Sequence, residues 1–188
     1  MKEDRCKIIP TTLTIFLLVV SSWWDTTLCF SEIKLPEKRD LKWDCLDISK
    51  RLDDLGYLSV TPEQFAEFMY KVSYCESGHK INAKGKDSAG SIGLWQMSKE
   101  TRRKLKVTHG GLNIQAENYY KFLVAGGKKL RYIKNSVDLH CYNFTPGNFR
   151  KDTLSRVTNP QLEALDLNRD GVITREDINL FQKKRLKA

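Results

Sequence analysis

The sequence contains no run in which apolar and polar residues alternate convincingly over the length of a β-strand. Only residues 130–133, Leu-Arg-Tyr-Ile, leave a strand open as an interpretation. Because alternation with a period of two marks a half-buried strand, its scarcity argues against a sheet-based body. It predicts a fold that is all-α, or nearly so.

Metal-binding and nucleophilic arrangements of histidine and cysteine are also missing. The three histidines, His79, His109 and His140, are far apart and lack ligand spacing, so each is expected at the surface or at a helix end. His140 is the most noteworthy of the three, because it precedes Tyr142 by two positions. No histidine has the context of a cysteine protease, which argues against a cysteine nucleophile.

Signatures of nucleic-acid binding are absent as well, although the 188-residue chain carries a formal net charge of +9. The lysines and arginines are scattered, and no basic helix is interleaved with stacking aromatic residues. We therefore expect no nucleic-acid partner. A basic body suits an anionic surface or polymer, such as a cell wall rich in carboxylates.

The N-terminus has the composition of a targeting segment. Residues 8–24 carry no charge and consist mainly of Ile, Leu, Val and Phe, which is short for a membrane span of about 20 apolar residues. Small residues near Cys29 offer an imperfect cleavage site, so residues 1–31 are expected to be a cleaved secretory signal. The alternative is an uncleaved inner-membrane anchor with Trp23 and Trp24 at the interface. Either way the protein is expected to be exported, to the periplasm or the extracellular space.

Residues 32–60 are expected to hold a linker, which ends near residue 40, and an N-terminal helix that stops at Gly56. This helix is predicted from one apolar stripe: Leu41, Cys45, Ile48, Leu52 and Leu55. Residues 61–157 are expected to form the main helical domain. After its first helix, three more are predicted: Ser98 to Leu105; Ile114 to Val124, capped by Asn113 and ended by Gly126 and Gly127; and one that Ser136 caps, leading into Cys141.

The first helix of that domain leads to the stretch around which the chain is organised. Thr61 and Gln64 form a capping box, with Pro62 in the first turn. Buried positions then recur with the period of a helix, and Gly78 ends it. The apolar members of this face are Phe65, Phe68, Met69 and Val72, and the next position on it is Glu76.

Glu76 is thus a carboxyl group at a position where the pattern calls for a core residue. Loss of solvation at the buried end of a helix favours the neutral form of a carboxyl group. A protonated carboxyl group can donate its proton to a leaving oxygen. The alternative is a glutamate that pairs with a nearby lysine or only caps the helix.

Three motifs in order make the chain similar to the lytic transglycosylase family of the soluble, lysozyme-like fold, over about residues 64–151. They are Glu76-Ser77, then Gly93-Leu94-Trp95-Gln96, then Tyr142-Asn143 with Pro146-Gly147-Asn148. The resemblance implies that Glu76 is the general acid and then the base that cleaves the glycan strands of peptidoglycan. It implies that Ser77 supports the helix end, that Gln96 lines the cleft with Asn143, and that Tyr142 sits over the acid. The chain departs from the family at Trp95, where Met is usual, and at Cys141, Phe144 and Thr145, where small residues are usual.

The chain also resembles goose-type lysozymes, which share the Glu-Ser and Gly-Leu-x-Gln patterns and carry extra aspartates between them. Asp87 stands at the matching distance before Gly93, whereas Ser98 occupies the place of the other aspartate. A hydrolase needs a second group that holds a water or acts as nucleophile. A transglycosylase needs none, because a hydroxyl of the sugar itself attacks. The resemblance therefore favours a transglycosylase, with a muramidase that uses Glu76 and Asp87 as the alternative and a non-catalytic wall-binding adaptor as the third interpretation.

The C-terminal segment, residues 158–188, carries an EF-hand-like loop between helices expected over 160–165 and 176–186. Its expected Ca²⁺ ligands are oxygen donors, with Gly171 at the sharp turn: Asp166, Asn168, Asp170, Val172, Thr174 and Asp177. Asp177 stands where most EF-hands have Glu, as in dockerin modules, of which the segment resembles one half. The shorter side chain predicts weaker affinity. We expect the ion to be structural, and no cofactor for catalysis.

Three cysteines remain after the leader: Cys45, Cys75 and Cys141. The lysozyme-like resemblance brings the motifs around Cys75 and Cys141 together, which implies a disulfide between them, with Cys45 as the rival partner. The alternative is three small buried side chains without a disulfide.

Peptidoglycan is the expected substrate. The sequence leaves three roles open: remodelling of the cell's own wall, opening of a path for a secretion or pilus machine, which would then be a partner, and attack on a competitor's wall.

Overall fold

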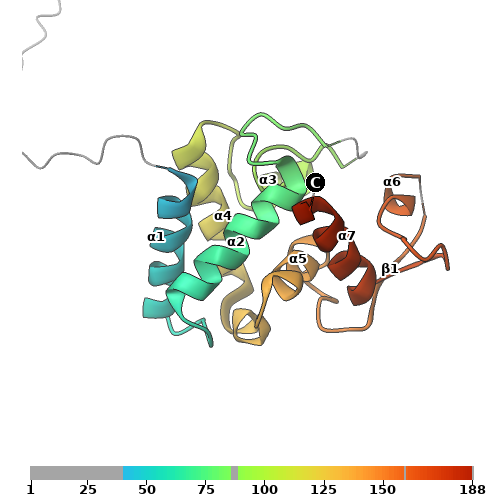
Figure 1. Ribbon diagram of the computed structural model, residues 1–188. Helices are drawn as coiled ribbons and strands as arrows, with labels where there is room; N and C mark the ends of the chain where they lie inside the picture. Colours follow the sequence, from blue (N-terminus) through green and yellow to red (C-terminus); the bar gives the residue numbers. More distant parts are fainter. Residues whose placement is uncertain (1–39, 86–88, 159, 188) are drawn as a thin grey trace, which may run out of the picture. The chain divides into compact units, whose positions relative to one another are not determined.

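The computed structural model describes residues 40–85, 89–158 and 160–187, which belong to one compact unit (Figure 1). The expected signal segment, most of the linker and Asp87 lie outside these described residues. Within the described part, no helix is long and apolar enough to cross a membrane.

The described part is mainly helical, which confirms the predicted class. Its elements are, in order, α1 (Leu41–Asp54), α2 (Pro62–Ser77), α3 (Lys99–Lys104), α4 (Leu112–Gly126), the 3₁₀ helix η1 (Gly127–Tyr132), α5 (Ser136–Phe144), β1 (Thr153–Arg156), α6 (Pro160–Glu163), β2 (Val172–Thr174) and α7 (Arg175–Lys187). The sequence pattern missed the two short strands, which pair antiparallel. Residues 130–133, for which a strand was left open, lie instead in η1 and its C-cap.

Helix α2 forms as the sequence predicts, and it is the central element of the core. The Thr61–Gln64 capping box is present, and Gly78 ends the helix in the left-handed conformation with φ 62°. Phe65, Met69 and Val72 are completely buried. Because α2 packs against α1, α5 and α7, its last turn is held from several sides (Figure 1).

The other predicted helices are confirmed with shifted ends. Helix α1 buries Cys45, Ile48 and Leu52, but Leu55 follows the last helical residue and is 47% exposed. Two caps were assigned to the wrong residue. Helix α4 begins after Gly111 and not after Asn113, and α5 is capped by Asn135, whose side chain accepts the N–H of Asp138, and not by Ser136.

The C-terminal segment packs into the helical body. Strand β1 precedes residue 158 and pairs with β2 inside the EF-hand-like loop. Helix α7 contacts α5 and α2 (Figure 1). Its Ile178 is completely buried. Arg175 at its start makes an ion pair with Asp138 of α5. The segment is therefore continuous with the fold that surrounds the end of α2.

Candidate active site

A cavity of about 430 Å³ opens beside the last turn of α2. Its volume falls in the range of ligand-binding pockets. The side chains around it come from α2, α3, α4, α5, α6, α7 and the loops between them. They are Glu76, Ala89, Ser91, Trp95, Gln96, Met97, Ser98, Thr101, Tyr119, Phe122, His140, Asn143, Phe144, Pro146, Leu162, Leu165 and Phe181.

Three residues from the three sequence motifs meet in this cavity: Glu76, Gln96 and Asn143. They are far apart in the chain, and the loop before α3 and the position of α5 bring them together. Glu76 is the only carboxyl group among the described lining residues. Its side chain is 23% exposed, so it is mostly desolvated but open to a ligand.

Glu76 contacts His140, a pairing that the sequence analysis did not predict. Its Oε1 lies 3.0 Å from Nε2 of His140 on α5, and the side chain of His140 is only 4% exposed. Nδ1 of His140 lies 3.0 Å from Nε2 of Gln182 on α7. Gln182 is held in turn by Ser136. The spacing of Ser136 and His140, one helical turn apart, could have indicated that they share a face of α5, whereas nothing in the sequence pointed to Gln182.

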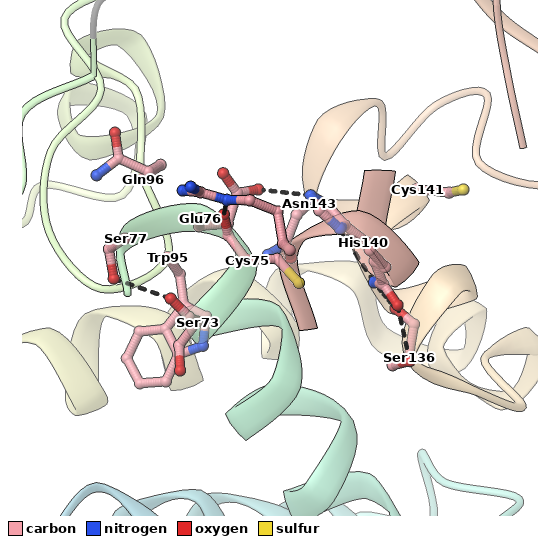
Figure 2. A network of polar contacts seen from close by, with 12 residues as sticks. Ser73, Cys75, Glu76, Ser77, Trp95, Gln96, Ser136, His140, Cys141 and Asn143 are labelled. Atoms are coloured by element: carbon pink, nitrogen blue, oxygen red, sulfur yellow. Dashed lines mark hydrogen bonds and ion pairs between the residues drawn. The ribbon is translucent and has the colours of Figure 1, made fainter. Parts of the chain in front are cut away.

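Gln96 is fixed in a tight loop at the opposite side of Glu76 from His140 (Figure 2). Its backbone has φ 47°, and its Nε2 donates to the carbonyl oxygens of Gly93 at 2.8 Å and Ala83 at 3.2 Å. The loop depends on Gln115 of α4, which the sequence analysis did not single out. The Gln115 Oε1 accepts the N–H of Leu94 at 2.8 Å, and its Nε2 donates to two further loop carbonyls.

Asn143 offers the cavity a hydrogen-bonding group. Its Oδ1 accepts the hydroxyl of Tyr119 at 2.8 Å, and its buried Nδ2 has no hydrogen-bond partner among the described residues. Burial raises the pKa of Tyr119, which keeps that hydroxyl a donor at ordinary pH. Trp95 stacks on Tyr119 at 4.2 Å between ring centroids, and its indole N–H donates to Met69. Trp95, where the chain departs from the pattern of the family it resembles, therefore forms part of the cavity wall.

Two of the expected substrate-binding residues lie behind the cavity. Tyr142 is 2% exposed and packs against Phe149 and Phe122, so it faces the core instead of Glu76. Burial raises its pKa to about 12. Ser77 is buried, and its hydroxyl donates to the carbonyl of Ser73 at 2.9 Å, within the last turn of α2.

The implied Cys75–Cys141 disulfide is not formed. Cys45, Cys75 and Cys141 are three buried free thiols. Figure 2 shows Cys75 and Cys141 well apart, with His140 between them. Burial raises the pKa of Cys75 and of Cys141 to about 11, so both remain protonated thiols.

In the EF-hand-like loop, aspartate side chains accept hydrogen bonds from the loop's own backbone N–H groups. Asp166 Oδ2 accepts the N–H of Gly171 at 2.9 Å, and Gly171 has φ 85°. Asp177 is 1% exposed, and its two oxygens accept the N–H groups of Leu167 and Thr174. In the described residues, no group of three or more His, Cys, Asp or Glu side chains is arranged to hold a metal.

Comparison of the chain with protein-family models, with curated proteins and with solved structures found no match. The arrangement of Glu76, Gln96 and Asn143 around one cavity is therefore the basis for a functional assignment.

Proposed function

We propose that this protein is an exported lytic transglycosylase that cleaves the MurNAc–GlcNAc β-1,4 bond of peptidoglycan. The observation that carries the proposal is the meeting of Glu76, Gln96 and Asn143 at one 430 Å³ cavity. A site for glycan cleavage needs one mostly desolvated carboxyl group in reach of the scissile oxygen, and the 23% exposed carboxyl group of Glu76 at the cavity supports that role.

A single carboxyl group suffices for this reaction. Glu76 gives its proton to the glycosidic oxygen as the C1–O bond breaks and an oxocarbenium-like centre develops. The sugar's 6-hydroxyl oxygen then bonds to C1, and its proton returns to Glu76. The product is a 1,6-anhydromuramyl end, and the carboxyl group is regenerated. That Glu76 is the only carboxyl group among the described lining residues supports this route over hydrolysis.

The rest of the cavity suits a sugar chain. Phe122, Phe144 and Phe181 present apolar rings that can pack against the C–H faces of sugars, while Gln96 and Asn143 present amide groups for hydroxyl or acetamido groups. Pockets of this kind combine apolar walls with a few placed polar groups. Export to the periplasm or beyond would bring the cavity to its substrate.

The EF-hand-like loop is part of the proposal as a structural Ca²⁺ site. The expected donors are all oxygens, which hard cations prefer, and the left-handed Gly171 gives the required turn. Among the described residues, each carboxylate oxygen of Asp166 and Oδ1 of Asp177 accepts a single N–H group and so keeps a lone pair for the ion, whereas Oδ2 of Asp177 accepts both the N–H and the hydroxyl of Thr174. Asn168, Asp170, Val172 and Thr174 would complete the set. The ion would fix the loop from which α7 starts.

Mass spectrometry of products from purified peptidoglycan tests the function. We expect anhydromuramyl ends from the wild-type protein, and a rate lower by about 10³-fold or more for Glu76→Gln. Glu67→Gln is the matched control, because Glu67 lies on the same helix, is 59% exposed and does not line the cavity.

Other outcomes separate the alternatives. Reducing muramic ends would identify a muramidase and direct attention to Asp87. No product, with co-sedimentation with cell walls intact, would identify a wall-binding adaptor. Normal cleavage by Glu76→Gln would show that the acid has been assigned to the wrong residue.

A further inference from the structure

A chain of buried polar side chains runs from Glu76 through α5 to α7. His140 and Gln182 are each 3% exposed; His140 lines the cavity, whereas Gln182 is not among the lining residues. Buried polar groups are costly unless their hydrogen bonds are satisfied. The arrangement of donors and acceptors along this chain therefore determines where each proton lies (Figure 2).

The orientation of the Gln182 amide is set by Ser136. The Gln182 Nε2 lies 3.0 Å from the carbonyl oxygen of Ser136, which can only accept. The Gln182 Oε1 lies 2.9 Å from the hydroxyl of Ser136, which donates to it. The opposite orientation of the amide would place two acceptors 3.0 Å apart. Nε2 of Gln182 is therefore the atom beside His140, and its second hydrogen points to Nδ1.

This orientation selects one form of His140. Since Gln182 donates to Nδ1, Nδ1 must accept and carries no hydrogen. The ring hydrogen is then on Nε2, 3.0 Å from Oε1 of Glu76. Nε2 donates to Oε1, so Oε1 is an acceptor and the acidic hydrogen of Glu76 belongs on Oε2.

We propose that His140, held as the neutral Nε2–H form by Gln182, is a positioning residue that directs the reactive proton of Glu76 to Oε2. This inference rests on the function proposed above. Oε2 gives its proton to the glycosidic oxygen and receives it back from the 6-hydroxyl group, while the Nε2–H stays on His140. The hydrogen bond to Oε1 strengthens when Glu76 becomes a carboxylate, because charge-assisted hydrogen bonds are about twice as strong as neutral ones. The contact thus favours the state in which the proton has been transferred.

The first test is independent of any activity. Two-bond ¹H–¹⁵N NMR spectra of ¹⁵N-histidine-labelled protein distinguish a ring nitrogen that carries hydrogen from one that does not. The chain has only three histidines, and a His140→Gln variant assigns the signal. We expect His140 to show a protonated Nε2 and an unprotonated Nδ1 in the wild-type protein, and a mixture of forms in Gln182→Leu. A protonated Nδ1 in the wild-type protein would overturn the inference.

The second test uses two substitutions of His140, of which one can donate a hydrogen bond and the other cannot. Gln at this position can place an amide N–H near the site of Nε2, whereas Leu cannot. We expect His140→Leu to lower kcat about 10- to 100-fold with KM nearly unchanged, and His140→Gln to recover part of that loss. Equal losses in the two variants, or an unchanged kcat in His140→Leu, would contradict the role. His109→Gln, at an exposed histidine outside the cavity, is the control.

The outcomes distinguish this inference from the proposed function. Wild-type cleavage with an unaffected His140→Leu variant overturns the inference alone. A wild-type protein that yields no product from peptidoglycan overturns both. Thermal melts of each variant, compared with the wild-type protein, show whether a loss of kcat reflects a loss of folded protein.

Discussion

Replacement of Gly93 by alanine tests whether the loop that carries Gln96 is built as the structure shows. Gly93 has φ 86°, a conformation that residues with a Cβ rarely adopt. A Cβ at this position would lie 2.4 Å from Oε1 and 3.1 Å from Cδ of Gln115. Gln115 is buried, and its Oε1 accepts the N–H of Leu94. The substitution therefore strains the backbone and also displaces the side chain that holds the loop to α4.

The two costs can be given magnitudes. A non-glycine residue at positive φ costs about 1–2 kcal/mol. Displacement of Gln115 leaves a buried backbone N–H without its acceptor, which costs about 1–3 kcal/mol. We expect Gly93→Ala to lower the free energy of unfolding by about 2–5 kcal/mol. Alanine substitutions at two other glycines separate the cost of backbone strain from the cost of displacing Gln115. Gly78 has φ 62° with nothing within 4 Å of a built Cβ, so Gly78→Ala should show the strain alone, and Gly147→Ala should show neither cost.

Urea denaturation of the three alanine variants gives the required free energies. A double-mutant cycle with Gln115→Ala then isolates the steric term, because in that background the new Cβ no longer meets an amide. Gly93→Ala should cost about 1–2 kcal/mol there, close to Gly78→Ala. Two results would show that the close approach of Gly93 and Gln115 does not shape the loop. One is a loss of unfolding free energy in Gly93→Ala no larger than that in Gly147→Ala. The other is an equal loss for Gly93→Ala in the wild-type and Gln115→Ala backgrounds.

Three further predictions concern the helix cap, the thiols and the EF-hand-like loop. Thr61→Ala should lower the free energy of unfolding by about 1 kcal/mol, measured by urea denaturation, because it removes the capping box of α2. Native protein should react very slowly with thiol reagents at pH 8, because a thiol with a pKa of about 11, such as Cys75 or Cys141, is then ionised in only about one molecule in a thousand. The rate of reaction should rise with pH. After denaturation, Cys45, Cys75 and Cys141 should all react. Titration of fewer than three of these thiols after denaturation would contradict the free-thiol structure. Added Ca²⁺ at about tenfold above a millimolar Kd should raise the melting temperature by about 3–6 °C, and Asp166→Asn should abolish the rise; an unchanged melt in the wild-type protein would refute a Ca²⁺ site in this loop.

The features that the sequence predicts correctly are those set by neighbours in the chain. The start of α2 follows from Thr61 and Gln64, its buried face from the period of its apolar residues, and its end from Gly78. These signals act within one or two helical turns, so no knowledge of the rest of the fold is needed. The same holds for α3, which runs from Lys99 to Lys104 within the predicted range Ser98 to Leu105, and for the placement of Glu76 at the cavity side of α2.

The features that the sequence does not predict depend on contacts between distant segments. Whether Tyr142 or Asn143 faces the cavity is decided by how α5 rotates against Phe122 and Phe149, and one helical position separates the two outcomes. The strand pair is equally non-local, since β1 pairs with β2 across the loop that contains α6. Gln182 is the clearest case, because a glutamine on a polar C-terminal helix has no local pattern that marks it as buried.

Helix α7 links the two motifs that the sequence presents as separate. It begins in the EF-hand-like loop, where Thr174 and Asp177 cap it reciprocally through a side-chain–backbone pair. Two turns later, its Gln182 sets the ring of His140, and Arg185 donates to the carbonyl of Cys75 beside Glu76. A helix whose first turn depends on the loop transmits disorder of that loop to its later turns, because helix formation is cooperative. Loss of order in the loop should therefore act on Glu76 through the α7 contacts, without any residue of the loop entering the cavity.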